Sequence, residues 1–206
     1  WRASLLSQLY SNILQALEAG STDSPTSTEL IRSKKTLAKK QLISNGFSEE
    51  QIQQIWANNP DEYFERESAD NIFWHTQEQL RAAPGKPLVA VKELEANDHP
   101  EGATLIFIHT RDAEFLFAKT TSAFERLHLN IVNARIVTSL NAHCLDTYTV
   151  LEPDGKPVGA NPRRVQEIET TLLQSLTQTT DKVRPANYRR SRKLRYFNKP
   201  ITTMLT

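Results

Sequence analysis

The side chains that could carry out catalysis or bind a metal are scattered through this chain of 206 residues. The five histidines are His75, His99, His109, His128 and His143. None forms a His-Asp doublet, and none has a second His or Cys at the spacing of metal ligands. The glycines form no phosphate-binding loop, and no nucleophile elbow occurs. We therefore expect no catalytic residue, no metal site and no cofactor in this chain.

One position combines a strand end with a helix start. Asp112 follows a β-rich run and precedes a helical pattern, so its side chain is expected either to cap the helix or to face a ligand. The free N–H groups from Ala113 to Phe115 could then hold a carboxylate, while Asp112 and Asn130 hold an ammonium group. Hydrophobic walls would come from Leu116 and Ile131. These six residues form the predicted ligand site, and its chemistry suits an amino acid.

Composition limits the partners. Lys+Arg number 25 and Asp+Glu 24, giving a net charge of +1, so no global field favours nucleic acid or a membrane. The basic stretch at 184–195 is interpreted as a solvated linker.

Cys144 is the only cysteine, which predicts a core residue and a reducing, cytoplasmic compartment. No apolar run approaches the ~20 residues of a membrane helix. Because the chain starts in helix-like and ends in β-like sequence, we expect a piece of a larger protein.

Hydrophobic periodicity divides the chain into two parts. Up to residue 83 the apolar residues recur at helical spacing, in segments beginning near residues 1, 26, 48, 59 and 68. Ser48 with Gln51 has capping-box spacing, Asn59 is an expected N-cap before Pro60, and Ser68 is another N-cap. Beyond Pro87 the period becomes 2. Strands are predicted at 88–91, 104–109, 130–140, 143–151 and 201–206, with helices at 116–127 and 161–176.

This order predicts an α+β fold: a helical segment followed by a ferredoxin-like βαββαβ domain. We divide the chain into a helical connector (1–87), a strand and linker (88–102), the βαββαβ domain (103–180), and a basic linker with a last strand (181–206).

Three strings of this second part resemble a known family. Residues 102–118 read GATLIFIHTRDAEFLFA, residues 129–136 read LNIVNARI, and residues 145–151 read LDTYTVL. They resemble an ACT domain, specifically the first of the two in bifunctional PII uridylyltransferase/uridylyl-removing enzymes. Upstream Ile55-Trp56, Tyr63-Phe64 and Trp74-His75 and downstream Arg189-Arg190 agree with the same family, so the resemblance covers essentially the whole chain.

The resemblance implies a regulatory role. Members of that family contain a nucleotidyltransferase domain, an HD phosphohydrolase domain and two ACT domains. They uridylylate the PII signal protein when glutamine is scarce and reverse this when glutamine is plentiful, with magnesium implied for the parent enzyme. This chain would then follow the HD domain, so both active sites lie outside it and the ACT domain contributes to glutamine sensing.

Two alternatives remain open. Many amino-acid-binding ACT domains carry Pro-Gly after the first loop's Asp or Asn, whereas Ala113-Glu114 stands here, and glycine would let the backbone approach a ligand more closely. An interaction module that pairs with a second ACT domain or a second copy, and binds no small molecule, fits this departure. An RNA-binding ferredoxin-like domain would need aromatic residues exposed on the sheet, where Phe107 is expected to be central.

Overall fold

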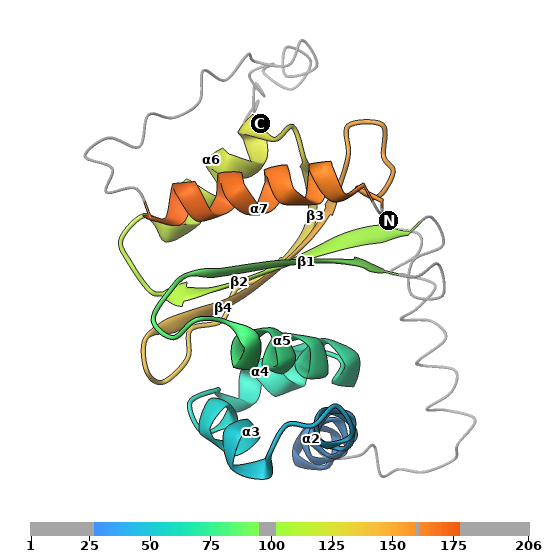
Figure 1. The fold of residues 1–206 in the computed structure, drawn as a ribbon, viewed down its shortest axis with the longest axis vertical. Coiled ribbons are helices and arrows are strands. Elements are labelled where there is room, and N and C mark those ends of the chain that lie inside the picture. Colours follow the sequence, from blue (N-terminus) through green and yellow to red (C-terminus); the bar gives the residue numbers. More distant parts are fainter. Residues whose placement is uncertain (1–26, 95–101, 160, 178–206) are drawn as a thin grey trace, which may run out of the picture.

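The computed structural model describes residues 27–94, 102–159 and 161–177 (Figure 1). The helices of the first part are α2 (Ser27–Ser44), α3 (Glu49–Trp56), α4 (Asp61–Arg66) and α5 (Ala69–Arg81). The second part contains β1 (Leu88–Leu94), β2 (Ala103–Arg111), α6 (Leu116–Arg126), β3 (Asn130–Arg135), β4 (His143–Leu151) and α7 (Pro162–Thr177). The helix expected at 1–20, the strand at 201–206 and the basic stretch at 184–195 lie outside the described residues. None of the helices described is long and apolar enough to cross a membrane.

Local capping signals set the helix starts of the first part. The Ser48 hydroxyl accepts from the Gln51 N–H, and the Gln51 side chain accepts from the Ser48 N–H, so the predicted capping box is present. Ser68 caps α5 by accepting from the Asn71 N–H. The start of α4 differs from the prediction: Pro60 occupies the N-cap position without a side-chain bond.

The four strands form one sheet in the order β1-β2-β4-β3, and each neighbouring pair is antiparallel. Since β4 runs between β2 and β3, these two strands are parallel, and α6 connects them across β4. This split βαβ unit, preceded by helices, confirms the predicted α+β fold class.

The outer position beside β2 is filled by the strand that precedes it. β1 pairs with β2 along its whole length, from Leu88 opposite His109 to Leu94 opposite Ala103. In a βαββαβ domain this position belongs to the last strand, which pairs antiparallel with the first. The sequence predicts a separate strand and linker at 88–102, whereas in the structure β1 is part of the sheet.

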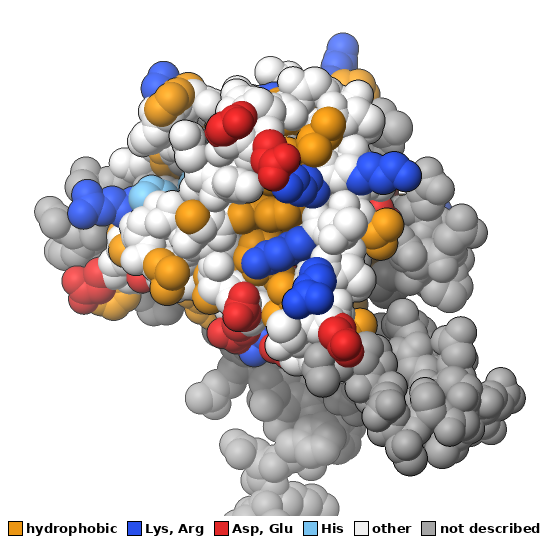
Figure 2. All heavy atoms as spheres, turned by 90° about the horizontal axis from the view of Figure 1, so that it is seen from below, with side chains coloured by type: hydrophobic (Ala, Val, Ile, Leu, Met, Phe, Trp, Pro, Cys, Tyr) orange, Lys and Arg blue, Asp and Glu red, His pale blue; other side chains and the backbone are white. Residues whose placement is uncertain are grey.

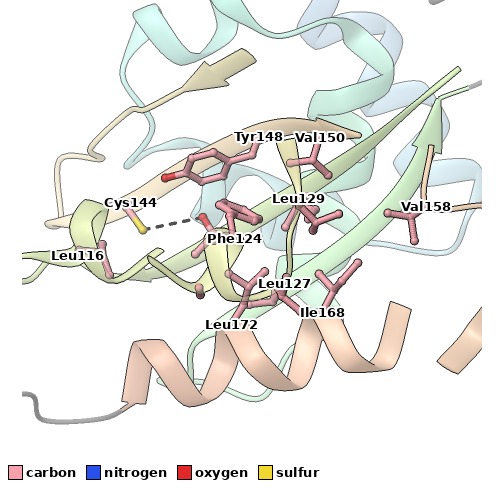
Figure 3. Packing of buried hydrophobic residues seen from close by; sticks show 14 residues of the cluster. Leu116, Phe124, Leu127, Leu129, Cys144, Tyr148, Val150, Val158, Ile168 and Leu172 are labelled. Carbon is pink, nitrogen blue, oxygen red and sulfur yellow. Dashed lines mark hydrogen bonds between the residues drawn. The ribbon is translucent and has the colours of Figure 1, made fainter. Parts of the chain in front are cut away.

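Helices cover both faces of the sheet (Figure 1). α6 and α7 pack on one face, where Ile106 and Ile108 of β2 join a buried cluster with Phe124, Tyr148 and Leu172; Figure 3 shows this cluster between the strands and α7. Because side chains alternate along a strand, Leu105 and Phe107 point to the opposite face, toward the helices of the first part. Both faces of β2 are therefore buried, which explains its continuous apolar run.

An aromatic stack joins the helices to this second face. The His75 ring of α5 stacks on Phe107 with centroids 3.9 Å apart, and Tyr63 Oη lies 3.0 Å from His75 Nδ1 in a hydrogen bond. Burial lowers the pKa of His75 to about 3, against the opposing effect of the Glu67 carboxylate. Phe107 is fully buried, so the exposed aromatic platform that an RNA-binding domain of this fold requires is absent at Phe107.

Candidate functional site

The residues predicted to form one ligand pocket lie at opposite ends of the sheet. Arg111, which precedes Asp112, pairs with His143 at the start of β4, whereas Asn130 pairs with Leu151 at its end. At about 3.3 Å per residue, β4 separates these positions by roughly 25 Å. The reason is topological. β2 and β3 are parallel, so both strands begin at one end of the sheet and finish at the other. The residues that follow β2 and the residues that begin β3 therefore lie at opposite ends. The structure does not bring Asp112 and Asn130 together.

The loop between β2 and α6, with the first residue of α6, contains four of the six predicted residues. Asp112, Ala113 and Phe115 are exposed, and Leu116 is buried as the first residue of α6. The Asp112 N–H donates to the Ala142 carbonyl at 2.8 Å, which ties the loop to the segment between β3 and β4. The sequence predicts that Asp112 either caps α6 or faces a ligand. The cap position is held by Phe115 in the left-handed region, with φ 62° and no side-chain bond.

Asn130 and Ile131 open the edge strand β3. The Asn130 amide donates to the Glu152 carbonyl at 3.3 Å, and Ile131 is 40% exposed. These two residues therefore present a polar and an apolar side chain at the far edge of the sheet. They form no pocket with the loop that follows β2.

A buried polar cluster, which the sequence analysis did not single out, lies beneath the β2–α6 loop. Asp146 of β4 is 2% exposed, and its Oδ1 has no hydrogen-bond partner among the described residues. Burial, reinforced by the Asp112 carboxylate, raises the pKa of Asp146 to about 7, although a hydrogen bond from the Val137 backbone opposes the shift. Burial and the Asp146 carboxylate also raise the pKa of Tyr148, whose hydroxyl lacks a partner in the same described region.

Strand alternation could have revealed Asp146. Cys144 and Tyr148 lie two residues to either side of it, and both point into the α6/α7 face (Figure 3). A carboxyl group between two core positions must point into the core as well. The prediction for Cys144 is met: it is 2% exposed, and burial raises the pKa of its thiol to about 12, so it is no nucleophile at neutral pH.

The β2–α6 corner, which we define as Asp112 to Leu116 with the underlying Asp146, has the charges that a zwitterion requires. Asp112 offers an exposed carboxylate. At the start of α6 the Leu116 N–H donates to the Ala113 carbonyl at 3.1 Å, and the next N–H groups of the first turn lack intrahelical acceptors, as at any helix start. A cation bound at Asp112 would also favour ionisation of Asp146, because the two carboxyl groups interact electrostatically. The corner can therefore couple the binding of an ammonium group to the loss of a proton.

Metal chemistry has little support in the described part of the chain. No group of three or more His, Cys, Asp or Glu side chains that could hold a metal ion occurs there. His109 and His143 stack in parallel with centroids 5.2 Å apart, and burial, with a further contribution from His143, lowers the pKa of His109 to about 4. The pair is an aromatic contact at the sheet end.

Known proteins match both the helical segment and the sheet domain of this chain. Residues 26–78 match the family described as the fifth domain of uridylyltransferase GlnD. Over 97% of its length the chain is 40% identical to the bifunctional uridylyltransferase/uridylyl-removing enzyme of Stutzerimonas stutzeri, and over 96% it is 39% identical to that of Pseudomonas fluorescens. The chain is homologous to part of these enzymes. This confirms the resemblance seen in the sequence.

The matched region is a small share of each relative. The chain spans 22% of the length of both enzymes, and the same holds for the Pseudomonas aeruginosa enzyme, to which it is 38% identical. No solved structure matches the chain at a significant level.

Proposed function

We propose that this chain is a regulatory part of an enzyme that uridylylates and deuridylylates the PII protein in the cytoplasm. The homology to bifunctional uridylyltransferase/uridylyl-removing enzymes supports this proposal. The described residues offer a tightly packed α+β body with an inert cysteine and a stacked histidine pair. We assign both reactions, and the magnesium expected for them, to other parts of the parent enzyme, because the chain spans 22% of the length of its relatives.

The β2–α6 corner is the proposed glutamine-responsive site. The observation that carries this assignment is the buried Asp146 carboxyl, with an unpartnered Oδ1, beneath the exposed Asp112. Glutamine is a zwitterion: its ammonium group would bind Asp112, and its carboxylate would bind the N–H groups at the start of α6, where the helix dipole adds roughly 0.3–1 kcal/mol. Ala113, Phe115 and Leu116 would line this position.

The second candidate function is pairing with another ACT domain or a second copy of the chain. β3 is an edge strand of the sheet, and Ile131 and Ile136 are each 40% exposed on it and just beyond it. Unpaired backbone groups beside exposed apolar side chains favour the addition of another strand. Asn130 and Ile131, which lie far from the corner, are assigned to this contact.

The test uses the full-length parent enzyme, PII, UTP and magnesium. Glutamine should inhibit uridylylation of PII by the unmodified enzyme. The Asp112→Asn variant should need about tenfold more glutamine for the same inhibition, because a charge-assisted hydrogen bond contributes about 1.5–3 kcal/mol. Glu114→Gln is the matched control, since it removes an exposed carboxylate from the same loop.

The outcomes separate the two candidates. An Asp112→Asn enzyme that keeps the glutamine response of the Glu114→Gln enzyme would exclude the corner as the sensor. If Ile131→Lys, rather than Asp112→Asn, removes the response, pairing along β3 is the better account. An enzyme without any activity on PII would refute the parent assignment itself.

A further inference from the structure

A groove in the helical segment lies on the other side of the sheet from the β2–α6 corner. It is formed by α2, α3 and the start of α4, and it encloses about 450 Å³. Its lining consists of Thr28, Ile31, Arg32, Lys35, Thr36, Lys39, Ile52, Gln53, Trp56 and Asp61. Figure 2 views the molecule from this side and shows a hollow with apolar side chains at its floor and Lys and Arg side chains around it. The volume lies within the range of small-molecule sites, about 300–1,000 Å³.

The floor of the groove is apolar and fixed in place. Ile31 and Ile52 are buried, and the Trp56 Nε1–H donates to Thr76 Oγ1 at 2.9 Å. The Trp56 ring also packs edge-on against Phe64, with centroids 5.7 Å apart. This hydrogen bond and ring contact hold the indole in one orientation, so the floor is ready for a flat apolar body before any ligand arrives.

The rim of the groove is basic. Arg32, Lys35 and Lys39 line it beside a single acid, Asp61. Lys39 pairs with Glu49, and the Lys35 ammonium lies 3.8 Å from the centre of the Phe64 ring. The exposed Arg32 guanidinium has no carboxylate partner within the described part of the chain. An exposed guanidinium above an apolar floor favours an anion joined to an apolar body.

We propose that this groove binds a small amphipathic anion, with a flat apolar body against Trp56 and Ile52 and a carboxylate, sulfonate or phosphate group at Arg32 and Lys35. The charge of the rim selects for the anionic group, and the rigid floor selects for an aromatic or branched apolar body. The site belongs to the helical segment, so it is independent of the proposed glutamine site on the far face of the sheet.

Two fluorescent probes test both halves of this proposal on the complete chain. 8-Anilinonaphthalene-1-sulfonate carries a sulfonate on an aromatic body, and N-phenyl-1-naphthylamine has the same rings without the charge. The sulfonate probe should bind with a saturable fluorescence increase and more tightly than the neutral probe. Arg32→Gln/Lys35→Gln should weaken the sulfonate probe by about tenfold and leave the neutral probe unchanged.

A matched pair of variants locates the site. Thr36 lines the groove and bonds to the carbonyl four residues earlier, at Arg32; Thr121 of α6 makes the same kind of bond to Phe117. Thr36→Trp should fill the groove and abolish saturable binding, whereas Thr121→Trp should not. Far-UV circular dichroism and urea unfolding check that each variant is folded. The proposal is overturned if the probe does not bind, if both tryptophan variants bind it equally, or if Arg126→Gln weakens it as much as Arg32→Gln/Lys35→Gln.

Discussion

The Glu67 carboxylate and the Arg135 guanidinium, 68 positions apart in the sequence, form an ion pair of 2.8 Å. Glu67 lies between α4 and α5, and Arg135 is the last residue of β3, so the pair joins the helical segment to the sheet. The Asn71 amide donates to the second Glu67 oxygen at 2.9 Å. Burial acts against the charge of Glu67, but the electrostatic interactions with His75 and Arg135, together with the hydrogen bonds from Arg135 and Asn71, outweigh it and hold the pKa of this carboxyl below its usual range. The helical segment is therefore fixed to the sheet by a buried charge as well as by packing.

Removing one partner of this ion pair should destabilise the whole chain. Arg135→Gln leaves the 2%-exposed Glu67 carboxylate without its counter-ion, which should lower the free energy of unfolding by about 3–5 kcal/mol. Urea unfolding followed by circular dichroism measures this loss. Arg66→Gln is the control, because the Arg66–Glu62 pair is exposed on α4 and should contribute less than about 1 kcal/mol. Equal effects of the two variants would contradict the account.

The stack of His75 on Phe107 should make the helices and the sheet unfold together. Phe107→Ala removes a fully buried ring and should cost about 3–5 kcal/mol. Tryptophan fluorescence of the helical segment and far-UV circular dichroism should still report one coincident transition. Phe117→Ala, at a position 55% exposed, should change stability by less than about 1 kcal/mol. Two separate transitions in the unmodified chain would show that the parts are independent.

His75 should weaken the fold in acid. Its pKa falls from 6.5 to about 3 on folding because the ring is buried, so the unfolded chain binds the proton more readily. Its contribution to stability is complete above pH 6.5 and is lost as the pH falls toward 3, a change on the order of 2–4 kcal/mol. Stability measured from pH 4 to pH 7 should depend less steeply on acid in His75→Gln. An unchanged acid dependence would refute the buried neutral ring.

Asp146 should have the opposite pH dependence. Its pKa rises from 3.8 to about 7 on folding, so the folded chain keeps a proton that the unfolded chain loses. Ionisation therefore reduces stability as the pH rises from about 4 to 7, by roughly 2–4 kcal/mol, and the reduction is complete above pH 7. The Asp146→Asn variant should lack this reduction, which unfolding at pH 4.5 and pH 8 can measure. If the Asp146→Asn variant is no more stable relative to the unmodified chain at pH 8 than at pH 4.5, ionisation of Asp146 does not reduce the stability of the fold.

Features with a local cause could be predicted from the sequence, and those that depend on pairing could not. The capping box at Ser48 and the cap at Ser68 need only neighbouring residues, and both are present. The strand expected at 130–140 ends instead at Arg135. Beyond it an isolated bridge joins Thr138 to Cys144, and the Leu140 N–H donates to the Asn58 carbonyl of the helical segment at 2.8 Å. No pattern within residues 130–140 predicts this hydrogen bond to the helical segment.

The residues of the candidate site differ in the same way. The loop from Asp112 to Leu116 is indicated by a local signal, a strand end followed by a helix start, and its role as a ligand site stays a prediction. Asn130 was grouped with it by sequence order, whereas strand direction places it at the other end of the sheet. Asp146 could have been found from the alternation of its strand. Its raised pKa depends on burial under α6 and on Asp112, which only the folded chain reveals.

The most direct test of the glutamine assignment is calorimetry of glutamine with the complete chain at pH 7. The account predicts a saturable heat that differs between phosphate and Tris buffers, because an ammonium group at Asp112 drives a proton from Asp146, whose pKa lies at about 7. Asp146→Asn should abolish the difference between the buffers, and Asp112→Asn should weaken binding about tenfold. The absence of a saturable heat, or a heat that is equal in both buffers, would contradict the account.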